Sequence, residues 1–74
     1  MNIKEKYSIQ EIQELYVTLF GKLADPQMPQ RDIVEQVIKH ITNNATTVSV
    51  FTVPHNGFNV MYNTDKGVQY IAIT

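Results

Sequence analysis

Apolar residues recur at helical spacing in the first half of the chain. After a predicted polar lead-in over residues 1–7, apolar side chains follow at intervals of three and four residues, at Ile9, Ile12, Tyr16, Leu19 and Leu23. This spacing predicts an amphipathic helix over residues 8–23. Ser8 and Glu11 have the spacing of a capping box, in which each side chain satisfies the other's backbone N–H. The helix is therefore predicted to begin at Ser8.

A second apolar stripe follows a short connector. Asp25-Pro26 stops the first helix, and Pro29 suits the first position of the next one, where its missing N–H costs nothing. The stripe consists of Ile33, Val34, Val37, Ile38 and Ile41. It predicts a helix over residues 29–43. Because the connector is short, the two helices are predicted to pack antiparallel or at a crossing angle.

From residue 46 the pattern changes from helical to extended. Residues 46–54, 58–64 and 68–74 are rich in Thr, Val, Ile, Phe and Tyr, which favours three β-strands. Pro54-His55-Asn56-Gly57 and Thr64-Asp65-Lys66-Gly67 supply the turns between them. These elements predict an α+β fold, with two helices packed on one face of a three-stranded antiparallel β-meander. A chain of 74 residues is expected to form a single small domain.

The turns determine which side chains share a face of the sheet. Asn56-Gly57 indicates a two-residue hairpin loop, which pairs Val53 with Val60 and Phe51 with Tyr62. These residues and Phe58 are then predicted to share one face. The opposite face is predicted to hold Val50, Thr52, Asn59, Met61 and Asn63.

Two registers remain open for the third strand. A two-residue turn places Ile71 and Ile73 beside Val60 and Phe58. A three-residue turn places Val68, Tyr70 and Ala72 there instead. In either register, the face turned away from the helices keeps apolar side chains.

Formal charge is nearly absent from the predicted sheet. No charged side chain occurs between residues 40 and 64, and Asp65 and Lys66 are the only charges after that. An exposed sheet usually carries Lys and Glu on its open face and its edges. A solvated sheet rich in Thr and Asn is one interpretation. The other, which we favour, is contact with another protein chain through Val50, Met61, Val68, Tyr70, Ile71 and Ile73.

The sequence offers little catalytic or metal-binding chemistry. It has no Cys, so disulfides and thiolate metal sites are excluded. His40 and His55 are the only histidines, and no nearby acid completes a recognisable metal-ligand spacing. The glycines are single and far apart, so no phosphate-binding loop is predicted. We therefore predict no catalytic residues, no cofactor, no metal and no small-molecule ligand.

Net charge and hydropathy restrict the class of partner. The formal net charge is −1, and the Lys and Arg residues form no basic stripe, which argues against a dominant nucleic-acid contact. Stacking of bases on Phe51, Phe58, Tyr62 and Tyr70 is the alternative, although the sheet carries a single Lys. No apolar run approaches the roughly 20 residues of a membrane span, and the N-terminus lacks the apolar stretch of a signal peptide. A cytoplasmic protein is expected.

These observations predict a non-catalytic protein that acts through protein–protein contact, as a homodimer or with another protein. Its size and simplicity suggest a bacterial or phage accessory or inhibitor protein. A weak nucleic-acid binder or small transcriptional modulator is the alternative.

Overall fold

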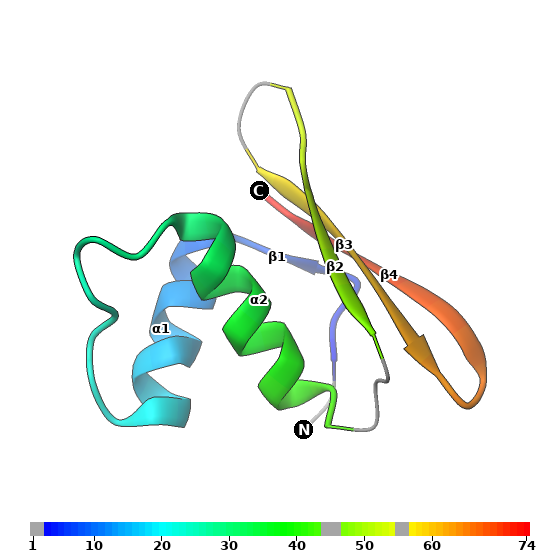
Figure 1. Cartoon of the computed structure of the whole chain (residues 1–74), viewed down its shortest axis with the longest axis horizontal. Helices are drawn as coiled ribbons and strands as arrows, with labels where there is room; N and C mark the ends of the chain where they lie inside the picture. The colour runs from blue at the N-terminus through cyan, green and yellow to red at the C-terminus, as the bar shows by residue number, and fades with distance from the viewer. Residues whose placement is uncertain (1–2, 44–46, 55–56) are drawn as a thin grey trace.

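The computed structural model describes residues 3–43, 47–54 and 57–74. Its elements in chain order are β1 (Lys6–Tyr7), α1 (Ile9–Phe20), α2 (Gln30–Ile41), β2 (Val48–Thr52), β3 (Phe58–Thr64) and β4 (Gly67–Ile73). Figure 1 shows both helices on the same side of the sheet. The predicted α+β class is confirmed.

The sheet is four-stranded and mixed, in the order β1-β4-β3-β2. The predicted three-stranded, purely antiparallel meander is therefore wrong, because β1 adds a parallel strand beside β4, with Lys6 opposite Ala72 and Tyr7 opposite Ile73. The Ala72 N–H donates to the Glu5 carbonyl at 2.9 Å. The predicted polar lead-in is thus partly strand, and two residues are too few for an alternating pattern to reveal it.

Helix α1 begins as predicted and ends earlier. The capping box is confirmed: the Glu11 N–H donates to Ser8 Oγ, and the Ser8 N–H donates to Glu11 Oε1, each at 3.0 Å. The helix stops after Phe20 because Gly21 adopts φ +73°, a left-handed C-cap. Leu23, which the sequence placed in the apolar stripe, is consequently 80% exposed.

Helix α2 is shorter than predicted at both ends. It runs over Gln30–Ile41, with Pro29 as its N-cap residue. The Pro29 carbonyl accepts hydrogen bonds from the N–H groups of Asp32 and Ile33. The helix ends at Thr42, whose N–H still donates to the Ile38 carbonyl. Its fully buried residues face the interior between the helices and the sheet.

The register between β2 and β3 differs from the prediction. Val60 lies opposite Val50, not Val53, a shift of three residues that turns β2 over. The Val53 N–H donates to the Gly57 carbonyl at 3.1 Å, so the hairpin connection is longer than a two-residue Asn56-Gly57 loop. Residues 55 and 56 of that predicted turn lie outside the described residues. As a result, Val50 points into the core and Phe51 points away from it.

The register between β3 and β4 follows the first of the two predicted alternatives. Thr64 lies opposite Gly67, so the turn consists of Asp65 and Lys66. The Lys66 N–H donates to Thr64 Oγ1 at 3.1 Å. Ile71 and Ile73 therefore lie beside Val60 and Phe58 and point towards the helices.

The hydrophobic core lies between the helices and the inner face of the sheet. Its sheet side consists of Tyr7, Val50, Phe58, Val60, Tyr62, Ile71 and Ile73, and its helix side of Ile12, Tyr16, Ile33, Val34, Val37 and Ile38. Figure 1 shows the helices against one side of the strands, which is the side on which this core lies. Successive side chains of a strand point to opposite faces of the sheet, so every second residue of these strands lies on the face away from the helices.

Two glycines with the same backbone conformation provide a matched test of this packing. Gly57 and Gly67 both have φ +110°, which disfavours any side chain. A Cβ on Gly57 would lie 2.5 Å from the Ile73 carbonyl oxygen in β4, whereas a Cβ on Gly67 meets nothing within 4 Å. We predict that Gly67→Ala lowers the free energy of unfolding by about 1–2 kcal/mol, and Gly57→Ala by about 1–3 kcal/mol more. Urea denaturation measures both, and equal losses would contradict the close approach at Gly57.

Candidate functional site

Four large apolar side chains gather on the face of the sheet opposite the helices. Phe51, Met61, Val68 and Tyr70 are called the outer patch below. Tyr70 is 67% exposed, Phe51 51% and Val68 47%. Met61 is half-buried. Exposed apolar residues are common singly, but a contiguous group on one sheet face is the arrangement that marks interaction surfaces.

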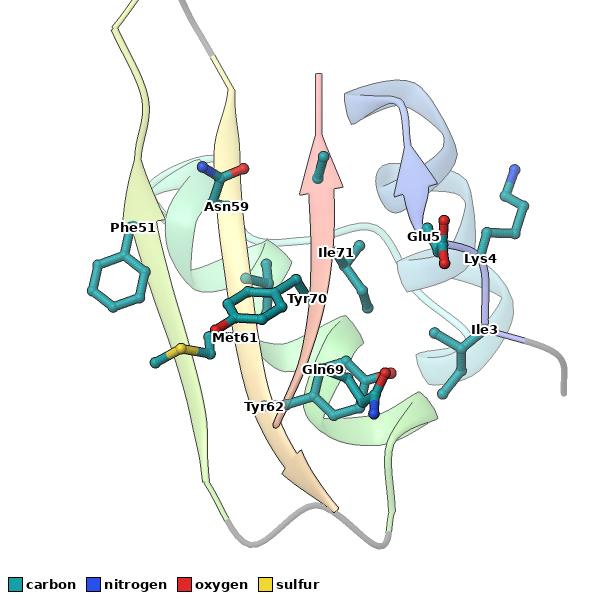
Figure 2. Close-up of a pocket in the computed structure, with 12 residues that line it drawn as sticks. Ile3, Lys4, Glu5, Phe51, Asn59, Met61, Tyr62, Gln69, Tyr70 and Ile71 are labelled. Atoms are coloured by element: carbon teal, nitrogen blue, oxygen red, sulfur yellow. The ribbon is translucent and has the colours of Figure 1, made fainter. Parts of the chain in front are cut away.

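Strand pairing brings the outer patch together. Met61 lies opposite Tyr70 across β3 and β4, and Phe51 lies opposite Asn59 across β2 and β3. Figure 2 shows the Tyr70 side chain extending across β3 towards Met61. Met61 lies on β3, between β2 and β4, and is less exposed than Phe51, Val68 and Tyr70.

An open hollow of about 810 Å³ lies over this face. Phe51, Asn59, Met61 and Tyr70 line it from the sheet, and the segment from Ile3 to Glu5 lines it from the side of β1 (Figure 2). Apolar and polar side chains of the sheet thus line the hollow, and its charged lining residues, Lys4 and Glu5, lie at one end.

Residues 3–5, called the rim segment below, are attached to the start of α1. Lys4 Nζ forms an ion pair and hydrogen bond with the Glu11 carboxylate. The Lys4 backbone N–H donates to the Tyr7 hydroxyl at 3.0 Å, and its ammonium lies 4.9 Å from the centroid of that ring. The hydrogen bond from Lys4, reinforced by the Ser8 N–H, lowers the pKa of Glu11 below its ordinary value of 4.5.

Formal charge is absent from three of the four strands. β2, β3 and β4 contain no Asp, Glu, Lys or Arg, and β1 contributes Lys6. The outer patch therefore faces solvent without the charged residues that usually protect a sheet surface from association.

The structure divides the predicted interface residues into two groups. Met61, Val68 and Tyr70 lie in the outer patch. The side chains of Val50, Ile71 and Ile73 are 3%, 2% and 0% exposed and lie within the core. The β2 register turns the Val50 side chain towards the helices. The two-residue turn before β4 turns the side chains of Ile71 and Ile73 the same way.

Phe51 lies on the outer face of the sheet, not on the core face predicted for it. Assuming a two-residue Asn56-Gly57 loop put Phe51 opposite Tyr62, in the core. The alternating pattern of β2 alone would have allowed either face, because Val50 and Phe51 are both apolar neighbours.

Two further features of the described residues lie away from the outer patch: a second hollow and a contact between two rings. A second hollow of about 390 Å³ lies between α1, the connector and α2, beside Leu23. The His40 ring meets Phe20 edge-on, with ring centroids 5.2 Å apart. His55 lies outside the described residues. Across residues 3–43, 47–54 and 57–74, no group of three His, Cys, Asp or Glu side chains is placed to hold a metal ion.

No described helix has the length and apolar character needed to cross a membrane. Comparisons with protein-family models, curated proteins and solved structures yield no match to this chain. The outer patch and the strands that carry it are therefore the features that bear on function.

The charge on Glu11 makes the attachment of the rim segment dependent on pH. A carboxyl group whose pKa is lowered by folding stabilises the fold above its unfolded pKa, and this contribution is lost as pH falls through the folded value. We predict that Glu11→Gln, which keeps the capping hydrogen bond, is less stable than the wild type near pH 7 and that the difference vanishes on acidification below 4.5. Urea denaturation at several pH values measures this. A difference that persists at low pH would show that charge is not its cause.

Proposed function

We propose that this protein is a non-catalytic binding protein that acts through protein–protein contact, and that its first partner is a second copy of the same chain. The observation that carries this proposal is the outer patch on an uncharged sheet face. Accessory or inhibitor proteins that block or bridge a larger protein work through surfaces of this kind. A bacterial or phage origin and a cytoplasmic location are part of the same proposal and rest on the sequence alone.

The size of the patch supports contact with a protein. An aromatic side chain has roughly 200 Å² of surface, so the exposed fractions of Phe51 and Tyr70 leave roughly 240 Å² in water. Val68 and Met61 bring the patch into the range of about 300–600 Å² reached by the largest patch of a typical monomer, which is often functional.

The size of the chain supports self-association in particular. A chain of 74 residues buries a thin core, and this one has no Cys with which to form a disulfide. Association with a second copy is the remaining common means by which such chains gain stability.

Phe51 is the residue at which to test this proposal, because it belongs to both the outer patch and the edge strand β2. We predict that the wild type has a solution mass near twice 8.5 kDa and that Phe51→Lys raises the dimer dissociation constant at least about tenfold. Light scattering over a concentration series measures both.

Thr18→Lys is the matched control, since Thr18 is exposed on α1 and the substitution adds the same charge far from the sheet. Urea denaturation should show that both variants remain folded. A wild type that stays monomeric at every concentration would contradict self-association. Equal effects of the two lysines would remove Phe51 from the contact.

Nucleic-acid binding is the second candidate, and one observation favours it. Phe51 and Tyr70 are exposed on one sheet face, as in proteins that stack single-stranded bases, whereas Phe58 and Tyr62 are buried. Against it, Lys6 is the only basic residue in the strands that the structure describes.

A salt series separates the two candidates. We predict that a labelled single-stranded oligonucleotide shows no binding tighter than about 10⁻⁴ M at physiological salt, the weak end of non-specific affinity. Fluorescence anisotropy measures this. Tighter binding that falls steeply with salt and is lost in Tyr70→Ala would favour nucleic acid over protein as the partner.

A further inference from the structure

Strand β2 forms one edge of the sheet and has no second strand partner among the described residues. Its hydrogen bonds to β3 alternate along the strand, as the bonds from the Asn63 N–H to the Thr47 carbonyl and from the Val53 N–H to the Gly57 carbonyl show. Ser49 and Phe51 therefore direct their backbone groups towards β3. The N–H and C=O groups of Val48, Val50 and Thr52 point to the open edge.

The two edges of the sheet differ in how they are protected. β1, at the far edge, is two residues long and lies in a charged segment, Lys4-Glu5-Lys6. Short length and charge both discourage pairing with another chain. β2 is five residues long, Val48-Ser49-Val50-Phe51-Thr52, and contains neither a charge nor a proline. One edge is thus closed to pairing, and the other has the composition of a strand that pairs.

We propose that the second copy binds by antiparallel pairing of β2 with β2, across a two-fold axis at Val50. This inference rests on the proposed self-association and names its surface. Val48 of each copy lies opposite Thr52 of the other, and the two Val50 residues lie opposite each other. About six N–H···O=C hydrogen bonds then join the copies, and the sheet continues from one copy into the next.

The backbone pattern selects this register over its neighbours. Only a two-fold axis at Val50 pairs all three outward-directed residues of β2 with one another. An axis at Phe51 sets Val48 opposite Pro54, which has no N–H to donate. An axis at Ser49 pairs Val48 with Val50 and leaves Thr52 without a partner in β2.

Side chains and charge agree with pairing between identical strands. In a symmetric pair, each side chain lies opposite a residue of the same strand in the other copy, so charges of one sign within the strand would repel across the contact, and β2 has none. On the outer face, Ser49 of one copy lies opposite Phe51 of the other, which leaves room for each aromatic ring. The two outer patches then adjoin on one surface, so the dimer presents about twice the apolar area of the monomer.

Engineered cysteines test the register, because the natural chain has none. Ser49 and Phe51 of opposite copies form a non-hydrogen-bonded pair, whose Cα atoms lie about 4.5 Å apart, within disulfide range. Two copies of the same residue lie roughly 8 Å apart in this register, beyond that range. Under mild oxidation, a mixture of Ser49→Cys and Phe51→Cys chains is expected to cross-link. Neither variant alone should exceed the background set by Lys22→Cys, which lies outside the sheet.

Two further variants separate the edge from the outer face as the dimer surface. Thr52→Pro removes an N–H that points to the open edge and is not used by β3, so it is expected to raise the dimer dissociation constant at least about tenfold. Tyr70→Lys changes the outer patch on β4, away from β2. Edge pairing predicts that it raises the dimer dissociation constant less than Thr52→Pro does, whereas contact of two sheets face to face predicts the larger effect. Light scattering measures both variants, and urea denaturation checks that each is folded.

Each contrary outcome has a distinct meaning. Cross-linking of Ser49→Cys alone, or of Phe51→Cys alone, would overturn the Val50 axis. A wild-type dimer that shows no mixed cross-link and dissociates in Tyr70→Lys would mean that two sheets meet face to face. The proposed function would then stand and the edge pairing would fail. A wild type that is monomeric throughout would overturn both. If Thr52→Pro fails to fold, the cross-linking pattern still distinguishes edge pairing of β2 from contact of two sheets face to face.

Discussion

The two-residue alternation of side chains along β2, β3 and β4 links the core of this protein to its surface. Each strand has only two faces, so every residue committed to the helices commits its neighbours to solvent. Val50, Val60 and Ile71 form a row across the inner face, one residue from each strand. The next residue of β2 and β3 and the preceding residue of β4, which are Phe51, Met61 and Tyr70, therefore lie on the opposite face of the sheet. The outer patch is a geometric consequence of a sheet whose strands are apolar on both sides and whose helices cover one.

The order of the two helices and of β2, β3 and β4 could be predicted from sequence because the local signals agree. Ser8 and Glu11 identified the start of α1, and the apolar stripe of α2 identified the face that it buries. The turn at Asp65 and Lys66 left two registers, and burial of Ile71 selects between them. Boundaries were less accurate, because Gly21 ends α1 in a conformation that no periodicity reveals.

The candidate site was predicted only in part, for two physical reasons. The register of β2 depends on the length of its hairpin connection, and an Asn-Gly pair indicates a turn without fixing which residues flank it. β2 is apolar at both Val50 and Phe51, so its composition did not correct the error. β1 was missed because its hydrogen bonds are to β4, more than sixty residues away in sequence, and Tyr7 is its only buried side chain.

The N-terminal attachment explains why the sheet has one open edge and not two. Lys4 contacts Glu11 and Tyr7, and the Glu5 carbonyl accepts a hydrogen bond from Ala72, so the same short segment caps α1 and covers the end of β4. With that edge covered by a short charged strand, β2 offers the longer run of unpaired backbone groups among the described edge strands. The outer patch begins on this same strand, at Phe51. A chain that pairs through β2 therefore satisfies its open edge and enlarges its apolar face in a single contact, and neither result requires a change in the fold.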